Sequence, residues 1–215
     1  GRDMLSRLVH GARISVAVGL GTVSLSLAIG LLVGSASGFF GGRIDHLFMR
    51  LADILLAFPG ILLAIAITSV LGPSLRNVLI ALSALGWVGY ARLIRGQILK
   101  VKEMEFVQSA TAVGSPPVRL LLVHILPNAF SPVIVEATFG IARAIVAEAG
   151  LSFLGLGVAP PAPSWGAMIS EGRHFLFVAP HLTTIPGLAI MITVMAFNFL
   201  GDGLRDAMDV REASP

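Results

Sequence analysis

The chain has 215 residues, of which 55% are hydrophobic and only 13% are charged, and its formal net charge is +3. The charged fraction lies well below that of soluble domains and indicates a membrane protein. The basic residues are scattered between apolar stretches, which excludes the concentrated basic face of a nucleic-acid-binding protein. Cysteine is absent, so a disulfide framework, a thiol nucleophile and a Cys-based metal site are also excluded.

Long runs without Asp, Glu, Lys or Arg predict helices that cross the membrane, because about 20 apolar residues cover the hydrocarbon core. Arg92 and Arg95 follow the uncharged part of one such run, and we place them at the level of the headgroups. Pro59 and Pro186 are expected to kink the second and fifth spans. We therefore predict an all-α, polytopic helical bundle with five spanning helices: Ser15–Ser37, Phe48–Leu71, Asn77–Ile94, Pro132–Leu156 and Leu182–Leu200.

A stripe of glycines marks one side of the first predicted span. Gly30, Gly34 and Gly38 recur every four residues, so they lie on one face of a helix. Small residues in such a stripe let another helix backbone approach closely inside a membrane. The sequence therefore predicts a packing face here, with a partner helix that belongs either to this chain or to another.

The distribution of Lys and Arg predicts the orientation, because five spans place the two ends of the chain on opposite sides and the cytoplasmic side carries more basic residues. Five basic residues fall on one side: Arg2, Arg7, Arg13, Arg76 and Arg173. Nine fall on the other: Arg43, Arg50, Arg92, Arg95, Lys100, Lys102, Arg119, Arg205 and Arg211. We therefore predict that the C-terminus and the 99–130 segment are cytosolic, and that Pro160–Arg173 faces outward.

The 99–130 segment is polar and interrupted by prolines, unlike the apolar runs on either side of it. Leu99–Val113 mixes charged and apolar residues in a pattern compatible with a helix outside the bilayer. Gly114 then suits the left-handed backbone conformation just past a helix end. The pattern predicts one helix followed by a tight turn.

A second short helix is expected after this turn. Ser115 suits an N-cap and Pro116 the first helical position, and the helix is expected to end near Ile125. Pro127 and Pro132 oppose a smooth continuation into the fourth span. The segment is therefore predicted to be ordered, and it either fits a groove on another protein or packs on its own bundle.

Three charged residues fall inside the fourth predicted span: Glu136, Arg143 and Glu148. A charge at the centre of a spanning helix costs about 2.5–3.5 kcal/mol on insertion scales, so each should face protein or water. Glu136 and Arg143 are seven residues apart and share one face, whereas Glu148 points elsewhere. Two interpretations stay open: a structural pairing with neighbouring helices, or a polar lining of a translocation path.

Motifs for catalysis and nucleotide binding are absent from the sequence. No G-x-x-x-x-G-K-[ST] motif occurs, which excludes a Walker-type ATP site. The five histidines lack the H-E-x-x-H spacing, and the stretch GSASG has Ala36 where a nucleophile elbow needs serine. We assign no catalytic, cofactor-binding or metal-binding residue, and an intramembrane hydrolase is disfavoured.

The 99–130 segment resembles a motif of ABC importer permeases, E-A-A, three residues, G, nine residues, I, one residue, L-P. The chain matches this motif at Ala110, Gly114, Leu126 and Pro127 with the correct spacing. It departs from the motif at three positions, where it has Gln108, Ser109 and His124. Glu105 occupies a position at which the peptide-transporting group commonly has Glu.

The resemblance covers nearly the whole chain. It includes GRDMLSRLVHGARIS, FFGGRIDHLFMRLADILLAFP, YARLIRGQ, EAGLSFLGLGVAPPAPSWGAMI and AFNFLGDGLRDAMD. The sequence departs from the common pattern at Val88 and Val210. It is identified as similar to the permease subunits of binding-protein-dependent ABC importers, in the dipeptide, oligopeptide and nickel group. The resemblance implies a type I importer permease fold, with residues 1–215 as a single permease domain that lacks one upstream helix.

The resemblance also implies a non-catalytic transport subunit in the bacterial inner membrane, without a cofactor. Its partners would be two cytosolic ATP-binding subunits, a second similar permease and an extracytoplasmic solute-binding protein. The 99–130 segment would be a coupling loop whose helix docks on an ATP-binding subunit, through Glu105, Gln108, Ser109, Ala110, Gly114, Leu126 and Pro127. Short peptides are the expected cargo, with nickel chelates and glutathione as alternatives. An ion-coupled secondary transporter is disfavoured, because paired midplane acids and internal repeats are not seen.

Overall fold

The computed structural model describes residues 3–159 and 161–212, with side chains to residue 208. Every regular element in these ranges is a helix, which confirms the all-α fold class. The elements in chain order are α1 (Met4–Phe40), α2 (Gly42–Leu56), α3 (Gly60–Leu71), α4 (Leu75–Lys102), α5 (Glu105–Ala112), α6 (Pro117–Arg119), the π-helix η1 (Leu120–Ile125), α7 (Leu126–Ala129), α8 (Ser131–Phe153), α9 (Trp165–Gly172), the 3-10 turn η2 (Arg173–Phe175) and α10 (His181–Glu212).

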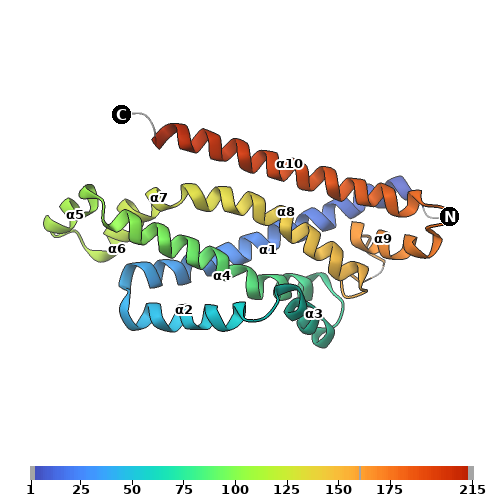
Figure 1. Ribbon diagram of the computed structural model, residues 1–215, viewed down its shortest axis with the longest axis horizontal. Helices are drawn as coiled ribbons and strands as arrows, with labels where there is room; N and C mark the ends of the chain where they lie inside the picture. Colours follow the sequence, from blue (N-terminus) through green and yellow to red (C-terminus); the bar gives the residue numbers. More distant parts are fainter. Residues whose placement is uncertain (1–2, 160, 213–215) are drawn as a thin grey trace.

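The long helices lie along one direction and form an elongated bundle (Figure 1). Helix α1 packs against both α4 and α8, while α10 packs against α8 on one side of the bundle. Helices α2 and α3 lie on the opposite side, and α3 packs against α4. The short elements α5 to α7 gather at the end of the bundle where α10 finishes, whereas α9 lies at the other end, near the start of α1 (Figure 1).

Three helices are long and apolar enough to cross a membrane: α1, α4 and the His181–Met208 part of α10. Two bent helix pairs raise the number to as many as five, namely α2 with α3, and the Pro117–Ala129 stretch with α8. The five predicted spans thus map onto the chain in the right order. Helices α1, α4 and α10 exceed the predicted bounds, and α10 runs through Pro186 as one helix.

The second predicted span, Phe48–Leu71, is wrong as a single kinked helix. The chain forms α2 and α3 instead, and their axes differ by 85°. Pro59, in the break, has an extended backbone with φ −58° and ψ 121°. Proline lacks the amide that the helical ladder needs, and it disfavours helical backbone in the residue before it. The residue expected to kink one helix therefore separates two.

The glycine stripe of α1 packs directly on α4, which confirms the predicted packing face and identifies a partner within the same chain. A β-carbon at Gly30 would lie 2.5 Å from Cβ of Tyr90, and one at Gly38 would lie 3.1 Å from the carbonyl oxygen of Arg95. Real Cβ atoms do not approach a neighbour as closely as 2.5 Å, because packed interiors have no spare volume for such overlap. Glycine at these positions therefore sets the distance between the two helices.

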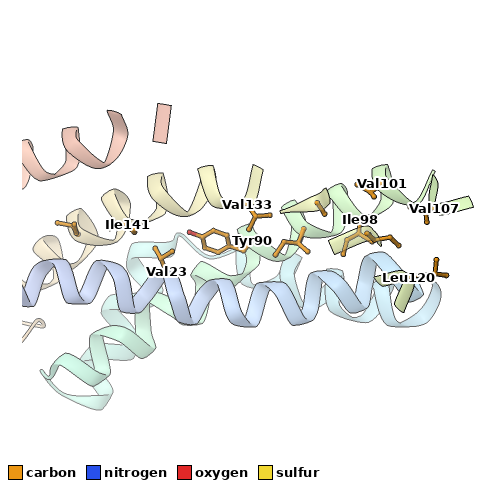
Figure 2. Close-up of a cluster of buried hydrophobic side chains, with 12 residues drawn as sticks. Val23, Tyr90, Ile98, Val101, Val107, Leu120, Val133 and Ile141 are labelled. Atoms are coloured by element: carbon orange, nitrogen blue, oxygen red, sulfur yellow. The ribbon is translucent and has the colours of Figure 1, made fainter. Parts of the chain in front are cut away.

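One cluster of buried hydrophobic side chains extends along the bundle and into the short helices at its end (Figure 2). In the bundle it includes Val23 of α1, Ile98 of α4 and Ile141 of α8. At the end of the bundle it continues to Val107 of α5 and Leu120 of η1, which Figure 2 shows beside α4. The short helices therefore share the core of the long ones.

The helices of the 99–130 segment differ in their bounds from the prediction. The expected first helix, Leu99–Val113, is divided, because α4 continues to Lys102 and α5 begins only at Glu105. The chain is helical over a continuous range from α6 to α7 and then bends by 57° before α8. The expected second helix therefore does not end near Ile125.

Three prolines explain these later bounds. Pro116, rather than Ser115, occupies the N-cap position of α6, and Pro117 lies in its first turn, where a missing amide leaves no hydrogen bond unmade. Pro127 lies in the first turn of α7 and cannot donate to the ladder. The preceding Leu126 amide donates to the Leu121 carbonyl, five residues back, so the ladder takes π register here.

Candidate functional site

Gly114 forms the turn between α5 and α6, as the sequence predicts. Its φ is +88°, in the left-handed region that favours glycine. The Gly114 amide donates to the Thr111 carbonyl at 2.9 Å, and the Ser115 amide donates to the Ala110 carbonyl at 3.1 Å. These two bonds form a Schellman motif, which satisfies the last carbonyls of α5. The turn is therefore an ordered one, held by two backbone hydrogen bonds.

The inner side of the 99–130 segment is anchored in the bundle core. Val107, Leu120 and Ile125 are buried, and Ile125 is only 1% exposed. The two apolar residues of the predicted site, Ala110 and Leu126, are partly buried against the same cluster. Because this cluster also contains residues of α4 and α8, a displacement of the segment is resisted by the cores of both helices.

The outer side of the segment presents the remaining predicted residues. Glu105, Gln108, Ser109 and Pro127 are all exposed, as is Gly114. The Gln108 side-chain amide donates to the Glu103 carbonyl at 3.1 Å, which closes the turn between α4 and α5. Apolar side chains on the same segment are exposed as well: Phe106, Val113 and Val118. The seven predicted residues thus divide into an exposed group and two that face the core.

Lys102 ties the start of this segment to the end of α1. Its Nζ donates to the Phe39 carbonyl at 3.0 Å and lies 5.5 Å from the centroid of the Phe39 ring. A cation near the last carbonyls of a helix is favourable because those carbonyls carry the negative end of the helix dipole. Helices α1 and α4 are therefore joined where the segment begins.

Glu136 and Arg143 form an ion pair along α8, so the structure brings these two predicted residues together. The Arg143 side chain is 63% exposed and the Glu136 side chain 39% exposed. Phe139, Val146 and Gly150 lie on the same side of the helix at intervals of three and four residues. A charged, exposed pair within this bent span is suited to water or a protein partner, not to lipid.

Glu148 is separate from this pair and fully buried. Its carboxylate accepts hydrogen bonds from Ser15 of α1 at 3.1 Å and from Ser152 of α8 at 2.6 Å. Ser164, which caps α9, donates to Ser152 at 3.2 Å, and the Trp165 amide donates to Ser15 at 3.3 Å. This network joins α1, α8 and the start of α9 and gives Glu148 a structural role.

A cavity of about 540 Å³ lies between α1, α3, α4 and α8. Its lining is mainly apolar, and its polar side chains are Thr22 and Ser26 of α1, Tyr90 of α4 and Arg143 of α8. A second cavity, of about 400 Å³, is lined by Glu136 together with residues of α4 and α10. The two partners of the ion pair on α8 therefore line different cavities: Arg143 lines the first and Glu136 lines the second.

Two ion pairs between α2 and α4 were not predicted from the sequence. Arg95 donates to both carboxylate oxygens of Asp45, at 2.5 and 2.6 Å, and Arg92 donates to Asp53 at 2.5 Å. The spacing is compatible with such pairs, because the two aspartates lie about two turns apart on one face of a helix and the two arginines about one turn apart on one face of another. Only the packing of α2 beside α4 identifies them as partners.

The described residues, 3–159 and 161–212, contain no group of three or more His, Asp or Glu side chains placed to hold a metal ion.

Residues 27–213 match the family model described as "Binding-protein-dependent transport system inner membrane component". The chain is 46% identical over 214 residues to the dipeptide transport system permease protein DppC of Alkalihalophilus pseudofirmus, which covers 100% of this chain and 70% of that protein. It is 49% identical over 209 residues to the glutathione transport system permease protein GsiD of Escherichia coli, covering 97% of this chain and 69% of the relative.

Solved structures support the fold. A chain of the MetNI methionine ABC transporter, in an inward-facing conformation, superposes with a TM-score of 0.77 at 19% identity, covering 96% of this chain and 98% of that one. A chain of an amino acid ABC transporter superposes with a TM-score of 0.65 at 14% identity, covering 96% of this chain and 99% of that one. By its sequence, this chain belongs to the family of binding-protein-dependent transport system inner membrane components, the permease subunits of ABC importers, and it has their type I fold.

Proposed function

We propose that this chain is a permease subunit of an ATP-driven importer of short peptides, in which it forms part of the translocation path. Two of its relatives are permeases for a dipeptide and for glutathione, and both are more than 40% identical over nearly the whole chain. The proposed partners are two cytosolic ATP-binding subunits, a second similar permease and an extracytoplasmic solute-binding protein. Glutathione and nickel chelates are the alternative cargoes.

The observation that carries the proposal is the continuous core between the 99–130 segment and the bundle. Val107, Leu120 and Ile125 of the segment belong to one cluster with Ile94 and Ile98 of α4. A segment anchored in this way transmits a displacement as a rigid body, whereas a flexible loop would absorb it. Docking of an ATP-binding subunit on the exposed side would therefore move α4 and α8.

The exposed side also fits a docking role. It presents Glu105, Gln108 and Ser109 beside exposed apolar side chains such as Val113, which is 88% exposed. A helix with small and polar residues on its outer face can enter a groove on a partner protein. We propose that these residues contact the ATP-binding subunit, and that Ala110, Gly114, Leu126 and Pro127 hold the docking helix in place.

The coupling role is tested by replacing Gly114 with valine. A β-branched residue is strained at φ +88°, so the end of α5 should shift. The ATP-binding subunits, docked on this segment, should then no longer move α4. In proteoliposomes that contain the complete importer, we expect the cargo transported per ATP hydrolysed to fall by about tenfold. This ratio is measured from labelled peptide uptake and phosphate release in the same vesicles.

Gly72→Val is the matched control. Gly72 has φ +85°, so the substitution imposes the same backbone strain, but it lies between α3 and α4, away from the 99–130 segment. We expect this variant to keep the parental ratio of uptake to hydrolysis. An unchanged ratio in Gly114→Val, or an equal loss in both variants, contradicts the coupling role.

The proposed orientation places the 99–130 segment and the C-terminus in the cytosol and the α9 region outside, in the bacterial inner membrane. Residues 1–215 contain no cysteine, so single-cysteine labelling needs no prior substitution among them. Val113→Cys and Phe177→Cys replace side chains that are 88% and 100% exposed. In intact cells, an impermeant maleimide should label the cysteine at position 177 and spare the one at 113. The reverse pattern would invert the topology and exclude docking to cytosolic ATP-binding subunits.

A further inference from the structure

The cavity between α1, α3, α4 and α8 contains buried hydroxyl groups that lack hydrogen-bond partners. Thr22 and Ser26 are 5% and 1% exposed, and within the described part of the chain neither Thr22 Oγ1 nor Ser26 Oγ makes a hydrogen bond. Buried polar groups are nearly always paired, because an unpaired one costs about 1–3 kcal/mol. Two such groups one turn apart on the lining of a single cavity therefore indicate a place where a polar ligand binds.

Arg143 supplies a charged donor to the same cavity. Its bond to Glu136 is made through one terminal nitrogen of the guanidinium. A guanidinium carries five N–H donors, so this pairing leaves donors for a second carboxylate. Tyr90 completes the polar lining, with its ring between α1 and α8 and its hydroxyl oxygen beside Gly140 (Figure 2).

Glu136 keeps a cation in its surroundings if it leaves Arg143. It lines the second cavity together with Lys100. An incoming carboxylate on Arg143 thus exchanges one anion for another, while Glu136 stays in a cavity to which Lys100 contributes a positive charge. This positive charge reduces the cost of removing Glu136 from its ion pair within the span.

We propose that Arg143 binds the carboxyl terminus of a short peptide in transit, displacing Glu136, and that the Thr22 and Ser26 hydroxyls hydrogen-bond its last peptide group. The apolar part of the lining, which includes Ile61, Leu82 and Leu85, accommodates the peptide's side chain. The volume of about 540 Å³ suits a molecule of this size. This inference rests on the proposed function as a peptide importer, and it adds the chemical group that the path recognises.

The test compares one labelled dipeptide as the free acid and as the C-terminal amide, in proteoliposomes with the complete importer and its binding protein. Arg143→Gln should lower ATP-driven uptake of the free acid by roughly tenfold or more and change uptake of the amide by less than about twofold. Arg143→Lys should recover part of the uptake of the acid. The binding protein is the same throughout, so a change in the acid-to-amide ratio reports on the permease.

Two further variants separate binding from a structural role. Glu136→Gln removes the internal competitor and should lower the concentration of free acid that gives half-maximal uptake, without affecting the amide. Thr22→Val combined with Ser26→Ala should lower uptake of both peptides. Ser35→Ala is the matched control, because Ser35 is also buried and unpaired on α1 but does not line the cavity.

The outcomes distinguish the inference from the proposed function. If the parent protein takes up both peptides and Arg143→Gln impairs both equally, Arg143 has only a structural role and the inference is wrong while the importer function stands. If the assembled parent complex hydrolyses ATP but takes up neither peptide, the peptide cargo is wrong and the inference fails with it.

Discussion

A β-carbon at Gly34 of α1 would lie 2.5 Å from the carbonyl oxygen of Ala91 on α4. The nearest atom belongs to the backbone, so no rotation of a side chain can relieve the overlap. Gly34 is buried at the centre of the α1 glycine stripe, whose neighbours pack on the same helix. This contact therefore fixes how closely the two helices approach.

Gly34→Ala should lower the stability of the permease by about 1–3 kcal/mol, because the added methyl group forces α1 away from α4. The measurement is the apparent melting temperature of the purified protein in detergent, followed by fluorescence size-exclusion chromatography. Gly89→Ala on α4 is the control, since a β-carbon at Gly89 meets no atom within 4 Å. Alanine favours helix over glycine, so Gly89→Ala should be neutral or stabilising. Equal melting temperatures for the two variants would refute the close packing.

Asp45→Asn should destabilise the contact between α2 and α4 by about 1–3 kcal/mol, because the Arg95 guanidinium loses a bidentate carboxylate. Arg95→Gln should have a similar effect, since it removes the other partner. The double variant should lose less stability than the sum of the two single losses, because it leaves no unpaired charge. A thermal-unfolding double-mutant cycle gives the coupling energy directly, and strictly additive losses would show that the ion pair is not stabilising.

Glu148→Ala should loosen α9 from α1 and α8, because the Ser15 and Ser152 hydroxyls lose the carboxylate that they share. The reporter is a single cysteine at Met168 of α9, a side chain that is 4% exposed. We expect maleimide to label this cysteine roughly tenfold faster in the Glu148→Ala background, because local opening exposes it.

Glu171→Ala provides the control for this experiment. Glu171 also lies on α9, but it is exposed and pairs with Arg7 at 2.8 Å. A surface ion pair contributes about 0–1 kcal/mol, so its loss should leave the labelling rate nearly unchanged. If Glu148→Ala labels no faster than Glu171→Ala, the buried network does not hold α9.

The features that the sequence predicted correctly depend on local rules. The apolar runs identify the spans because any helix that crosses a membrane must present apolar side chains along its length. Gly114 is identifiable because its left-handed turn suits glycine, and the stripe of Gly30, Gly34 and Gly38 because four residues are close to one helical turn. The family is also readable from the sequence, since its motifs extend over nearly the whole chain.

The predictions failed where local rules leave several outcomes open. Pro59 predicts an interruption, but the 85° angle between α2 and α3 depends on how α3 packs on α4. The continuation of helix through Pro127 depends on the buried contacts of Leu120 and Ile125, which hold η1 against α4. Tertiary packing thus decided whether the helix bends, is interrupted or continues at each proline.

The sequence by itself determined that this is a helical membrane permease, where its apolar helical stretches lie and which glycines pack or turn, because helix period and hydrophobicity are properties of neighbouring residues. Only the tertiary structure decided that Asp45 pairs with Arg95, that Ser15 reaches Glu148, and that Thr22 and Arg143 share one cavity. The physical reason is that these contacts join residues tens to more than a hundred positions apart. Their meeting depends on how whole helices pack against one another.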